Sequence, residues 1–386
     1  MAISKKKKIL IVVPSFSIGG TIVSLHSLLS VIDTTKYEID VFALSRDGAY
    51  LDKMPNCSVL PENVWLSMRC RNVGLLKRVI NNCLRVIRAL FRKHNWSIEP
   101  FLCRLANRKF DFKKYDTVVN FSESIANVVC HYPARNRIAW VHCDYQRYLM
   151  LVNRDEAEVY EKFNTIVCVS EYTRSKFCDC LPKMAARTIA IHNVINVEAI
   201  IKKSEEPIDD DRFVTDMFTI VSAGRLDPVK QFHLIPNLAA EIKKRTDKKF
   251  VWYIIGGDRG FESYADEIKK DIVECGVANE VVLLGEKGNI YPYMAKANLY
   301  VSTSLSEAFP LVINEAKALG IPIVSNNFGS AAESIEDGVD GFIVSVKNGM
   351  SKRISELIAE QVSLPLKEQN SHDTSRAIVE QVERCL

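Results

Sequence analysis

Short apolar runs rich in Val and Ile alternate along the chain with longer segments of helical period. Apolar and polar residues do not alternate within these runs, which is typical of parallel strands covered on both faces. The pattern therefore predicts an α/β protein with parallel sheets. The predicted strands are residues 9–14, 39–44, 116–121, 137–141, 165–170, 218–223, 249–255, 281–284, 299–304, 321–325 and 341–344.

The predicted strands fall into two sets separated by a polar segment, KKSEEPIDDDRF, at residues 202–213. This segment contains a proline and has no apolar period, so it is predicted to be a linker or surface loop. Each half of the 386-residue chain is long enough for one doubly wound domain with its own core. We therefore expect an N-terminal domain at residues 1–200 and a C-terminal domain from residue 201.

The composition is that of an ordinary soluble globular protein, with 47% hydrophobic and 25% charged residues. The net charge of +4 is smaller than that of most dedicated nucleic-acid binders. No run reaches the roughly 18 apolar residues of a membrane span. The eleven cysteines are scattered and form no CxxC pair, which argues against a zinc ribbon or a thioredoxin-like motif. Reduced thiols indicate a cytoplasmic location.

A glycine turn follows the first predicted strand, in the segment PSFSIGG, and a helix is expected to begin near Thr21. Gly19 and Gly20 allow a tight turn that directs the helix amides toward an anion. The same glycines also suit a turn without a ligand. The segment is not GxGxxG, and no acidic residue follows about 20 positions later, so a dinucleotide site is not indicated.

A second turn, GRLDPVK, follows the strand at residues 218–223. It places Arg225 and Lys230 at the carboxyl edge of a sheet, where open α/β folds bind ligands. Arg225 offers charge-assisted hydrogen bonds to a diphosphate, and Lys230 offers a point charge. The alternative is a pair of ordinary solvent-facing cations.

A third segment, LSEAFPLVINEAKALG, follows the strand at residues 299–304. Glu307 lies in its turn, Pro310 at the expected first helical position, and Glu315 further along the helix. Carboxylates beside a phosphate site suit recognition of sugar or ribose hydroxyls, although each is also compatible with a solvated side chain or a helix-start charge. The amides expected to cap a phosphate are those of Phe309, Leu311 and Val312.

An acidic triplet, Asp209 to Asp211, has the DxD form that can hold a divalent cation beside a diphosphate. It lies in the predicted linker and no strand precedes it. A solvated acidic run is the preferred interpretation, and no metal site is predicted.

The ordered set of motifs resembles the family 4 (group 1) glycosyltransferases, which are retaining nucleotide-sugar enzymes of the GT-B fold, and bacterial surface-polysaccharide enzymes in particular. The resemblance implies two Rossmann-like domains that face each other across a cleft. It also implies that the C-terminal domain ends at residue 366 and that the segment 367–386 returns to the first domain. The matching motifs, which span nearly the whole chain, are IGG (18–20), WVHCD (140–144), VSEYT (169–173), HNVIN (192–196), GRLDPVK (224–230), Glu307-x7-Glu315 and DGVDGFIV (337–344).

The resemblance also implies residue roles. Arg225 and Lys230 match the pair that binds the donor diphosphate, and Glu307 matches the carboxylate that contacts the transferred sugar. Glu315 matches the carboxylate that binds the nucleotide ribose, and His142 matches the histidine that reaches the sugar from the N-terminal domain. Two further matches are the phosphate and acceptor loop at Gly19 and Gly20, and the base pocket at Leu284 and Gly285.

This chain departs from the family pattern at two places. Ala308 replaces the usual glycine, and the segment GGDRG at residues 256–260 replaces GEG or GGGP.

The function that the resemblance implies is retaining transfer of a sugar from a nucleotide-diphosphate sugar to a glycan or lipid-linked glycan in capsule or lipopolysaccharide synthesis. UDP is the nucleotide expected from its frequency in the family. Negative charge grows on the leaving diphosphate in such a reaction, and Arg225, Lys230 and a helix N-terminus would stabilise it without a metal cofactor. Same-face attack and a covalent intermediate on Glu307 are both open routes.

Two other function classes are compatible with parts of the sequence. One is a catalytically silent nucleotide-sugar-binding subunit of a glycan assembly complex, which the complete set of site residues disfavours. The other is a dehydrogenase, which the missing GxGxxG disfavours.

Residues 63–109 contain eleven basic residues and one acidic residue, Glu99. A helical wheel from residue 75 to residue 93 separates an apolar half from a basic half, which suits an anionic membrane surface. The alternative is that the apolar half packs on the first sheet.

Nucleic acid is a poorer partner because no aromatic residues interleave the basic ones. We therefore expect a cytoplasmic protein at the inner face of the cytoplasmic membrane. The basic residues are Arg69, Arg71, Lys77, Arg78, Arg85, Arg88, Arg92, Lys93, Arg104, Arg108 and Lys109.

Overall fold

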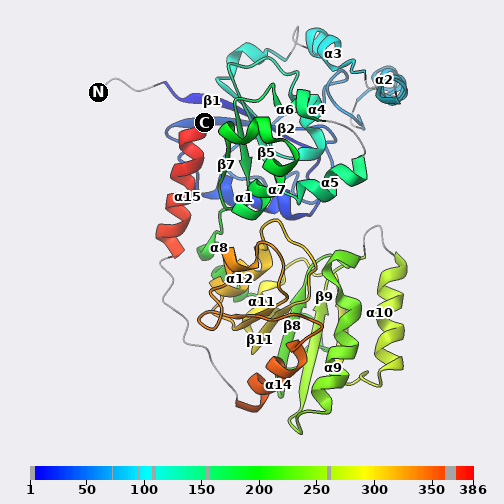
Figure 1. The fold of residues 1–386 in the computed structure, drawn as a ribbon. Coiled ribbons are helices and arrows are strands. Elements are labelled where there is room, and N and C mark those ends of the chain that lie inside the picture. The colour runs from blue at the N-terminus through cyan, green and yellow to red at the C-terminus, as the bar shows by residue number, and fades with distance from the viewer. Residues whose placement is uncertain are drawn as a thin grey trace. The chain divides into compact units, whose positions relative to one another are not determined.

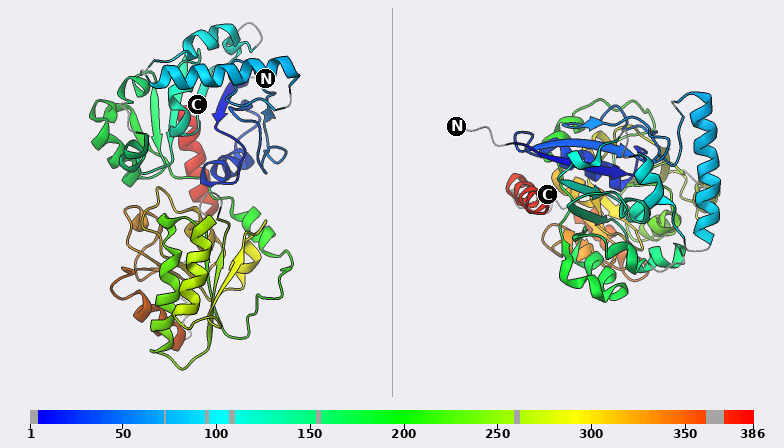
Figure 2. Two further views of the ribbon diagram at one scale, coloured as in Figure 1. Left: turned by 90° about the vertical axis from the view of Figure 1, so that its right-hand side faces the viewer. Right: turned by 90° about the horizontal axis from the view of Figure 1, so that it is seen from above.

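The structure is a computed structural model that describes residues 5–71, 73–93, 96–106, 110–152, 156–258, 262–360 and 371–386. The chain divides into two units (Figure 1). Unit 1 comprises Met1–Val194 and Ser375–Leu386, and unit 2 comprises Ile195–Thr374. Each unit is built on one sheet with helices packed on it (Figures 1 and 2).

The sheet of unit 1 has seven strands in the order β3-β2-β1-β4-β5-β6-β7. All of its strand pairs are parallel. The chain winds outward in one direction from β1 and in the other direction from β4, so the topological switch point lies between these two strands. The strands are β1 (Lys7–Val13), β2 (Tyr37–Ala43), β3 (Ser58–Val59), β4 (Thr117–Asn120), β5 (Asn136–Val141), β6 (Thr165–Cys168) and β7 (Thr188–Ala190).

The helices of unit 1 come mainly from the segments between its strands. They are α1 (Gly20–Val31), α2 (Leu75–Lys93), α3 (Glu99–Ala106), α4 (Ala126–Val129), α5 (Tyr145–Val152), α6 (Ala157–Tyr160) and α7 (Glu171–Cys180), with 3-10 turns η1 (Phe112–Lys114), η2 (Glu123–Ile125) and η3 (Pro182–Arg187). The last helix, α15 (Ser371–Cys385), brings the chain end into this unit. Thr117 Oγ1 donates to the carbonyl of Leu386 (2.7 Å), and Lys36 Nζ pairs with Glu383 (2.9 Å).

The sheet of unit 2 has six strands in the order β10-β9-β8-β11-β12-β13, all paired in parallel, with its switch point between β8 and β11. The strands are β8 (Phe218–Ala223), β9 (Phe250–Ile255), β10 (Val281–Gly285), β11 (Leu299–Ser302), β12 (Ile323–Ser325) and β13 (Phe342–Ile343). The helices are α8 (Val197–Ser204), α9 (Ile235–Lys243), α10 (Glu262–Glu274), α11 (Tyr291–Ala295), α12 (Leu311–Ala318), α13 (Ala331–Ser334) and α14 (Met350–Glu360), with 3-10 turns η4 (Pro228–Lys230) and η5 (Phe232–Leu234).

Two apolar clusters cover the two faces of the unit 2 sheet. In β9, Trp252 and Ile254 belong to one cluster, while Tyr253 and Ile255 belong to the other. Every residue of β9 is buried because helices cover both of its faces. This packing is the physical reason for the unbroken apolar run in the sequence.

All eleven predicted strands are present, and the predicted parallel α/β architecture is confirmed. Strands β3 and β7 were not predicted, because they are only two and three residues long and lie at the edges of the sheet. The predicted linker was partly wrong, because residues 202–204 complete α8 and Phe213 packs on the core. Of the helices in the described part of the chain, none has the length and apolar character that crossing a bilayer requires.

Candidate active site

Three glycines bring the strand ends of unit 2 close together at the carboxyl edge of the sheet. A Cβ on Gly256 would lie 1.8 Å from the carbonyl oxygen of Gly224, so this position requires glycine. The Gly224 amide donates to the carbonyl of Ile255 (3.0 Å), and the Gly256 amide donates to that of Gly285 (2.9 Å). Gly256 is the first glycine of the segment GGDRG, which departs from the family pattern, and it is needed for this close approach of the strand ends.

Asp227 organises the turn that carries both predicted cations. Its Oδ1 accepts from the Val229 amide (2.9 Å) and caps η4, and its Oδ2 pairs with Arg225 Nη2 (2.6 Å). Arg225 is 61% exposed and is held beside the turn by this pair. Asp227 was not predicted as a site residue, although an aspartate before Pro228 is a helix-start signal that could have identified it.

The structure brings Lys230 and Glu307 together as an ion pair. Their side chains are only 23% and 17% exposed, and Ser304 Oγ donates to the same carboxylate oxygen (2.7 Å). The loops after β8 and β11 are also joined directly, because Thr303 Oγ1 donates to the Lys230 carbonyl (2.7 Å). A cation and a carboxylate that lie far apart in the sequence are thus held in one partly buried cluster at the switch point.

Helix α12 begins immediately after this cluster, at Leu311. Pro310 is its N-cap, so the expectation that Pro310 would be the first helical residue was wrong by one position. The helix start has no side-chain cap and no acidic residue in its first turn. The amides of Leu311 and Val312 therefore lie at the positive end of a helix, beside Phe309, in an arrangement that suits an anion.

Glu315 lies on α12 and is buried. Its Oε1 accepts a hydrogen bond from the Tyr291 hydroxyl (3.0 Å), and burial raises its pKa to about 7. The raised pKa leaves this carboxyl divided between its neutral and charged forms near neutral pH, in contrast with an ordinary surface glutamate.

The strand end at Leu284 and Gly285 presents backbone rather than a side chain. Leu284 lies in the core, and Gly285 is exposed with φ +76°. Arg212 donates to the Leu284 carbonyl (3.0 Å) and pairs with Asp210 (2.7 Å), which also pairs with Lys287 (2.6 Å). Hydrogen bonds from Arg212 and then Lys287 hold the pKa of Asp210 well below its usual value.

The middle residue of the acidic triplet is therefore engaged by two cations. Within the residues that the structure describes, no group of three or more His, Cys, Asp or Glu side chains has a metal-binding arrangement.

In unit 1, the predicted glycine turn lies between β1 and α1. Gly19 has an extended backbone and is the N-cap of α1, and both Gly19 and Gly20 are exposed. The turn is braced by Gly48, where a Cβ would lie 2.1 Å from the backbone of Phe16. This contact was not predicted, although the Asp-Gly pair at Asp47 and Gly48 is a turn signal.

His142 follows β5, and its ring packs against Phe121 with centroids 4.9 Å apart. Its Nε2 atom is buried and has no hydrogen-bond partner among the described residues. Burial lowers its pKa to about 3, so the ring is neutral at physiological pH. Glu123, which sequence analysis missed, accepts from the His142 amide (2.9 Å), and burial raises the pKa of this carboxyl.

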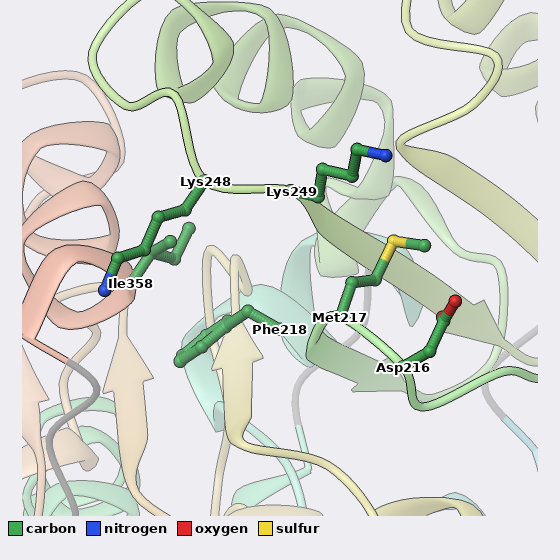
Figure 3. Close-up of a pocket in the computed structure, with 6 residues that line it drawn as sticks. All are labelled: Asp216, Met217, Phe218, Lys248, Lys249 and Ile358. Carbon is green, nitrogen blue, oxygen red and sulfur yellow. The ribbon is translucent and has the colours of Figure 1, made fainter.

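A pocket of about 500 Å³ lies at the other end of the unit 2 sheet (Figure 3). It surrounds the beginning of β8, whereas the predicted site residues follow the carboxyl ends of the strands. One of its two lysines, Lys248, is already bonded to the Ala359 carbonyl (2.6 Å). Open α/β sheets bind ligands at their carboxyl edge, so this pocket is not the candidate site. Its lining residues are Asp216, Met217, Phe218, Lys248, Lys249 and Ile358.

Comparison with known families places residues 203–377, which include almost all of unit 2, in the glycosyl transferases group 1 family. An N-acetylgalactosaminyltransferase of Campylobacter jejuni, which acts on an N-acetylgalactosamine-N,N'-diacetylbacillosaminyl-diphospho-undecaprenol, is 34% identical over 159 residues. That alignment covers 41% of this chain and 40% of the relative. The lipopolysaccharide core mannosyltransferase LpcC of Rhizobium leguminosarum is 32% identical over 100 residues, 25% of this chain and 28% of the relative. The alignments therefore span less than half of these relatives.

Solved structures match the whole chain at low sequence identity. HepE of Anabaena in complex with UDP has a TM-score of 0.69 and 19% identity, with 98% of both chains covered. Sucrose-phosphate synthase of Thermosynechococcus elongatus has a TM-score of 0.70 and 16% identity, again with 98% of both chains covered. These likenesses show that the fold is GT-B. The match to the glycosyl transferases group 1 family thus lies in the C-terminal unit and spans less than half of the chain.

Proposed function

We propose that this protein transfers a sugar from a nucleoside diphosphate sugar, with UDP as the nucleotide, to a glycan or lipid-linked glycan during synthesis of a bacterial surface polysaccharide. The observation that carries the proposal is the Lys230–Glu307 ion pair at the switch point of unit 2. Relatives named for lipopolysaccharide and undecaprenol-linked glycan synthesis support the substrate class. The UDP complex of a GT-B neighbour supports the choice of nucleotide.

The chemistry of sugar transfer explains why a cation and a carboxylate are needed together. Negative charge grows on the leaving diphosphate while positive charge develops on the sugar ring. Lys230, Arg225 and the N-terminus of α12 supply positive charge for the diphosphate. When a diphosphate competes for Lys230, the Glu307 carboxylate becomes available to the transferred sugar.

Glu315 and His142 have separate proposed roles in binding. Glu315 offers a buried carboxyl that can accept or donate a hydrogen bond to a ribose hydroxyl, because its pKa is near 7. His142 offers a neutral ring with an unpaired, buried Nε2 atom, which would pair with a hydroxyl of the sugar.

Retention at the anomeric carbon is part of the proposal and leaves two routes. In same-face attack, the leaving diphosphate takes the proton of the acceptor hydroxyl. In double displacement, Glu307 forms a covalent glycosyl intermediate that the acceptor then cleaves. A donor analogue that accumulates a covalent adduct on Glu307, detected by mass spectrometry, would distinguish the second route from the first.

We further propose that no divalent metal is needed, because cations and helix amides supply the charge that a metal would otherwise provide. Turnover in the presence of EDTA should equal turnover with added Mg²⁺ or Mn²⁺. Activity that disappears with EDTA and returns with metal would contradict this.

The proposed function is tested first by thermal unfolding with a panel of nucleotides and nucleotide sugars. A ligand at 100 times its dissociation constant stabilises the folded state by about 2.7 kcal/mol. We expect a shift with UDP and with one UDP-sugar, and loss of that shift in Lys230→Met. Lys352→Met, at an exposed lysine on α14, is the matched control and should keep the shift.

The ligand that shifts unfolding is then used in a transfer assay with lipid-linked acceptors, and NMR of the product reports the anomeric configuration. No shift with any nucleotide would contradict the proposal. A shift without turnover on any acceptor would favour the silent subunit instead.

A further inference from the structure

Helix α2 of unit 1 exposes most of its apolar face. Its residues Leu75, Leu76, Val79, Val86 and Leu90 are between 50% and 77% exposed. At about 100° per residue, they fall within an arc of about 100° on the helix surface. A soluble protein normally turns such a stripe toward its core, so α2 has the reverse of the expected orientation. The alternative in which the whole apolar half packs on the sheet is therefore wrong.

Two buried polar side chains fix α2 in this orientation. Asn81 Oδ1 accepts from the Cys70 amide (3.0 Å), and its Nδ2 donates to the Ser67 carbonyl (2.8 Å). Arg88, one heptad later on the same face, pairs with Glu99 of α3 (2.8 Å) and donates to the Trp65 carbonyl (2.6 Å). Rotating the apolar stripe inward would break every one of these bonds in a buried environment.

Basic residues lie beside the exposed stripe. Lys77, Arg78 and Arg85 are exposed, and α2 contains no acidic residue. On the helical wheel, Arg78 and Arg85 lie about 60° and about 80° from the Leu75 edge of the apolar arc, whereas Lys77 lies on the opposite side of the helix. Figure 2 shows α2, in light blue, as a long straight helix along the periphery of unit 1. An apolar stripe with cations on its flank matches the boundary between lipid headgroups and acyl chains.

We propose that α2 docks on an anionic lipid bilayer, with its apolar stripe among the acyl chains and Arg78 and Arg85 at the headgroups. A lipid surface fits better than a second copy of this chain, because a second α2 would bring basic residues against basic residues. Trp96 and Phe101 are also exposed, just after α2 and on α3, and add aromatic side chains of the kind that favour a membrane interface. The inference rests on the geometry of unit 1 and not on the proposed function.

The test is flotation of the full-length protein with vesicles. Vesicles of phosphatidylcholine with about 30% anionic phosphatidylglycerol are compared with vesicles of pure phosphatidylcholine at low salt. We expect binding to the anionic vesicles and weaker binding to the neutral ones. Arg78→Gln with Arg85→Gln should weaken binding to anionic vesicles about 25-fold, at about 5-fold per cation. The triple variant Leu76→Gln, Val86→Gln, Leu90→Gln keeps the charge and should lose binding to both.

A matched control lies on α10 of unit 2, where Val273 and Lys270 are similarly exposed. Val273→Gln with Lys270→Gln should float like the wild type. Circular dichroism and the unfolding temperature without any ligand should be the same in all variants, which shows that each is folded and keeps this test independent of the donor site.

Two results would overturn the inference. One is failure of the wild type to float with anionic vesicles at low salt. The other is unchanged flotation of the triple variant. If the wild type fails to float, a dimer in sedimentation equilibrium that is lost in the triple variant would assign the stripe to a second copy of the chain.

Discussion

Lys230 and Glu307, 77 residues apart in the sequence, form an ion pair at the carboxyl edge of the unit 2 sheet. They meet because β8 and β11, which precede them, are hydrogen-bonded neighbours although two strands intervene in the sequence. The pair is mostly buried and is supported by Ser304. The doubly wound topology thus joins two motifs whose proximity a linear sequence does not show.

Glu307→Gln should lower turnover by at least about 100-fold, because the amide keeps the shape but cannot carry the carboxylate charge toward the sugar. UDP affinity should change little. Steady-state kinetics with the identified UDP-sugar and calorimetry with UDP check the two effects. Glu356→Gln, at a surface carboxyl of α14, is the control. Turnover at the wild-type level would remove Glu307 from the mechanism.

Lys230→Met should destabilise unit 2 by about 1–3 kcal/mol, since it leaves the partly buried Glu307 carboxylate without its cation. The double variant Lys230→Met, Glu307→Gln should recover part of this loss, because no charge is then left unpaired. Chemical denaturation of the wild type, the two single variants and the double variant gives the coupling free energy between Lys230 and Glu307. Strictly additive effects would show that the pair contributes nothing to stability.

Arg225→Ala, in contrast, should leave stability nearly unchanged, because this side chain is 61% exposed. It should raise the KM for the donor and lower kcat, since its charge acts on the diphosphate both in the ground state and as negative charge grows there. Kinetics and thermal unfolding of the same sample separate the effects. Unchanged kinetic constants would exclude Arg225 from the donor site.

Glu315 should make the protein less stable as the pH rises from about 4.5 to about 7. Burial raises its folded pKa to about 7 from the ordinary value of 4.5, so the folded state holds a proton that the unfolded state releases. The resulting loss in the free energy of unfolding is absent below pH 4.5 and reaches about 3 kcal/mol above pH 7.

Glu315→Gln removes this titration while it can still accept from Tyr291. The variant should therefore exceed the wild type in stability at pH 8 and match it at pH 4.5. Urea denaturation at both pH values measures the difference. A stability difference that does not change with pH would show that Glu315 titrates normally.

His142→Phe should remain folded and lose activity. Nε2 has no partner among the described residues, so its removal costs no hydrogen bond there, and stability should stay within about 1 kcal/mol. Turnover should fall if the nitrogen binds the sugar. Because the pKa of His142 is about 3, the wild-type pH profile should show no step near 6.5 from this residue. Full activity in the variant would assign His142 a purely structural role.

Arg88→Met should destabilise unit 1 by about 3–5 kcal/mol, since it leaves Glu99 as a buried, unpaired charge. Arg88→Met with Glu99→Met should recover much of the loss. Arg85→Met, at an exposed position one turn earlier on α2, is the control and should have little effect. Equal stability of Arg88→Met and Arg85→Met would contradict the buried ion pair.

The strands and the site motifs could be predicted because they depend on local properties. Residues 218–223 form β8 over the predicted range, since an unbroken apolar run of that length has few other structures in a parallel sheet. The position of Lys230 after that strand follows from the same run. The roles of Glu123 and Gly48 depend on contacts with His142 and Phe16, which lie elsewhere in the sequence. Asp227 contacts its neighbours Arg225 and Val229, so a local signal was available for it.

The sequence alone determined that α2 is a helix with an apolar half and a basic half, because helical periodicity needs only the order of residues. It did not determine which half faces the protein. Only the tertiary structure decided this, by placing the carbonyls of Trp65 and Ser67 and the carboxylate of Glu99 where Asn81 and Arg88 can reach them. Buried polar groups must be paired, and that requirement outweighs the preference of the apolar stripe for the core.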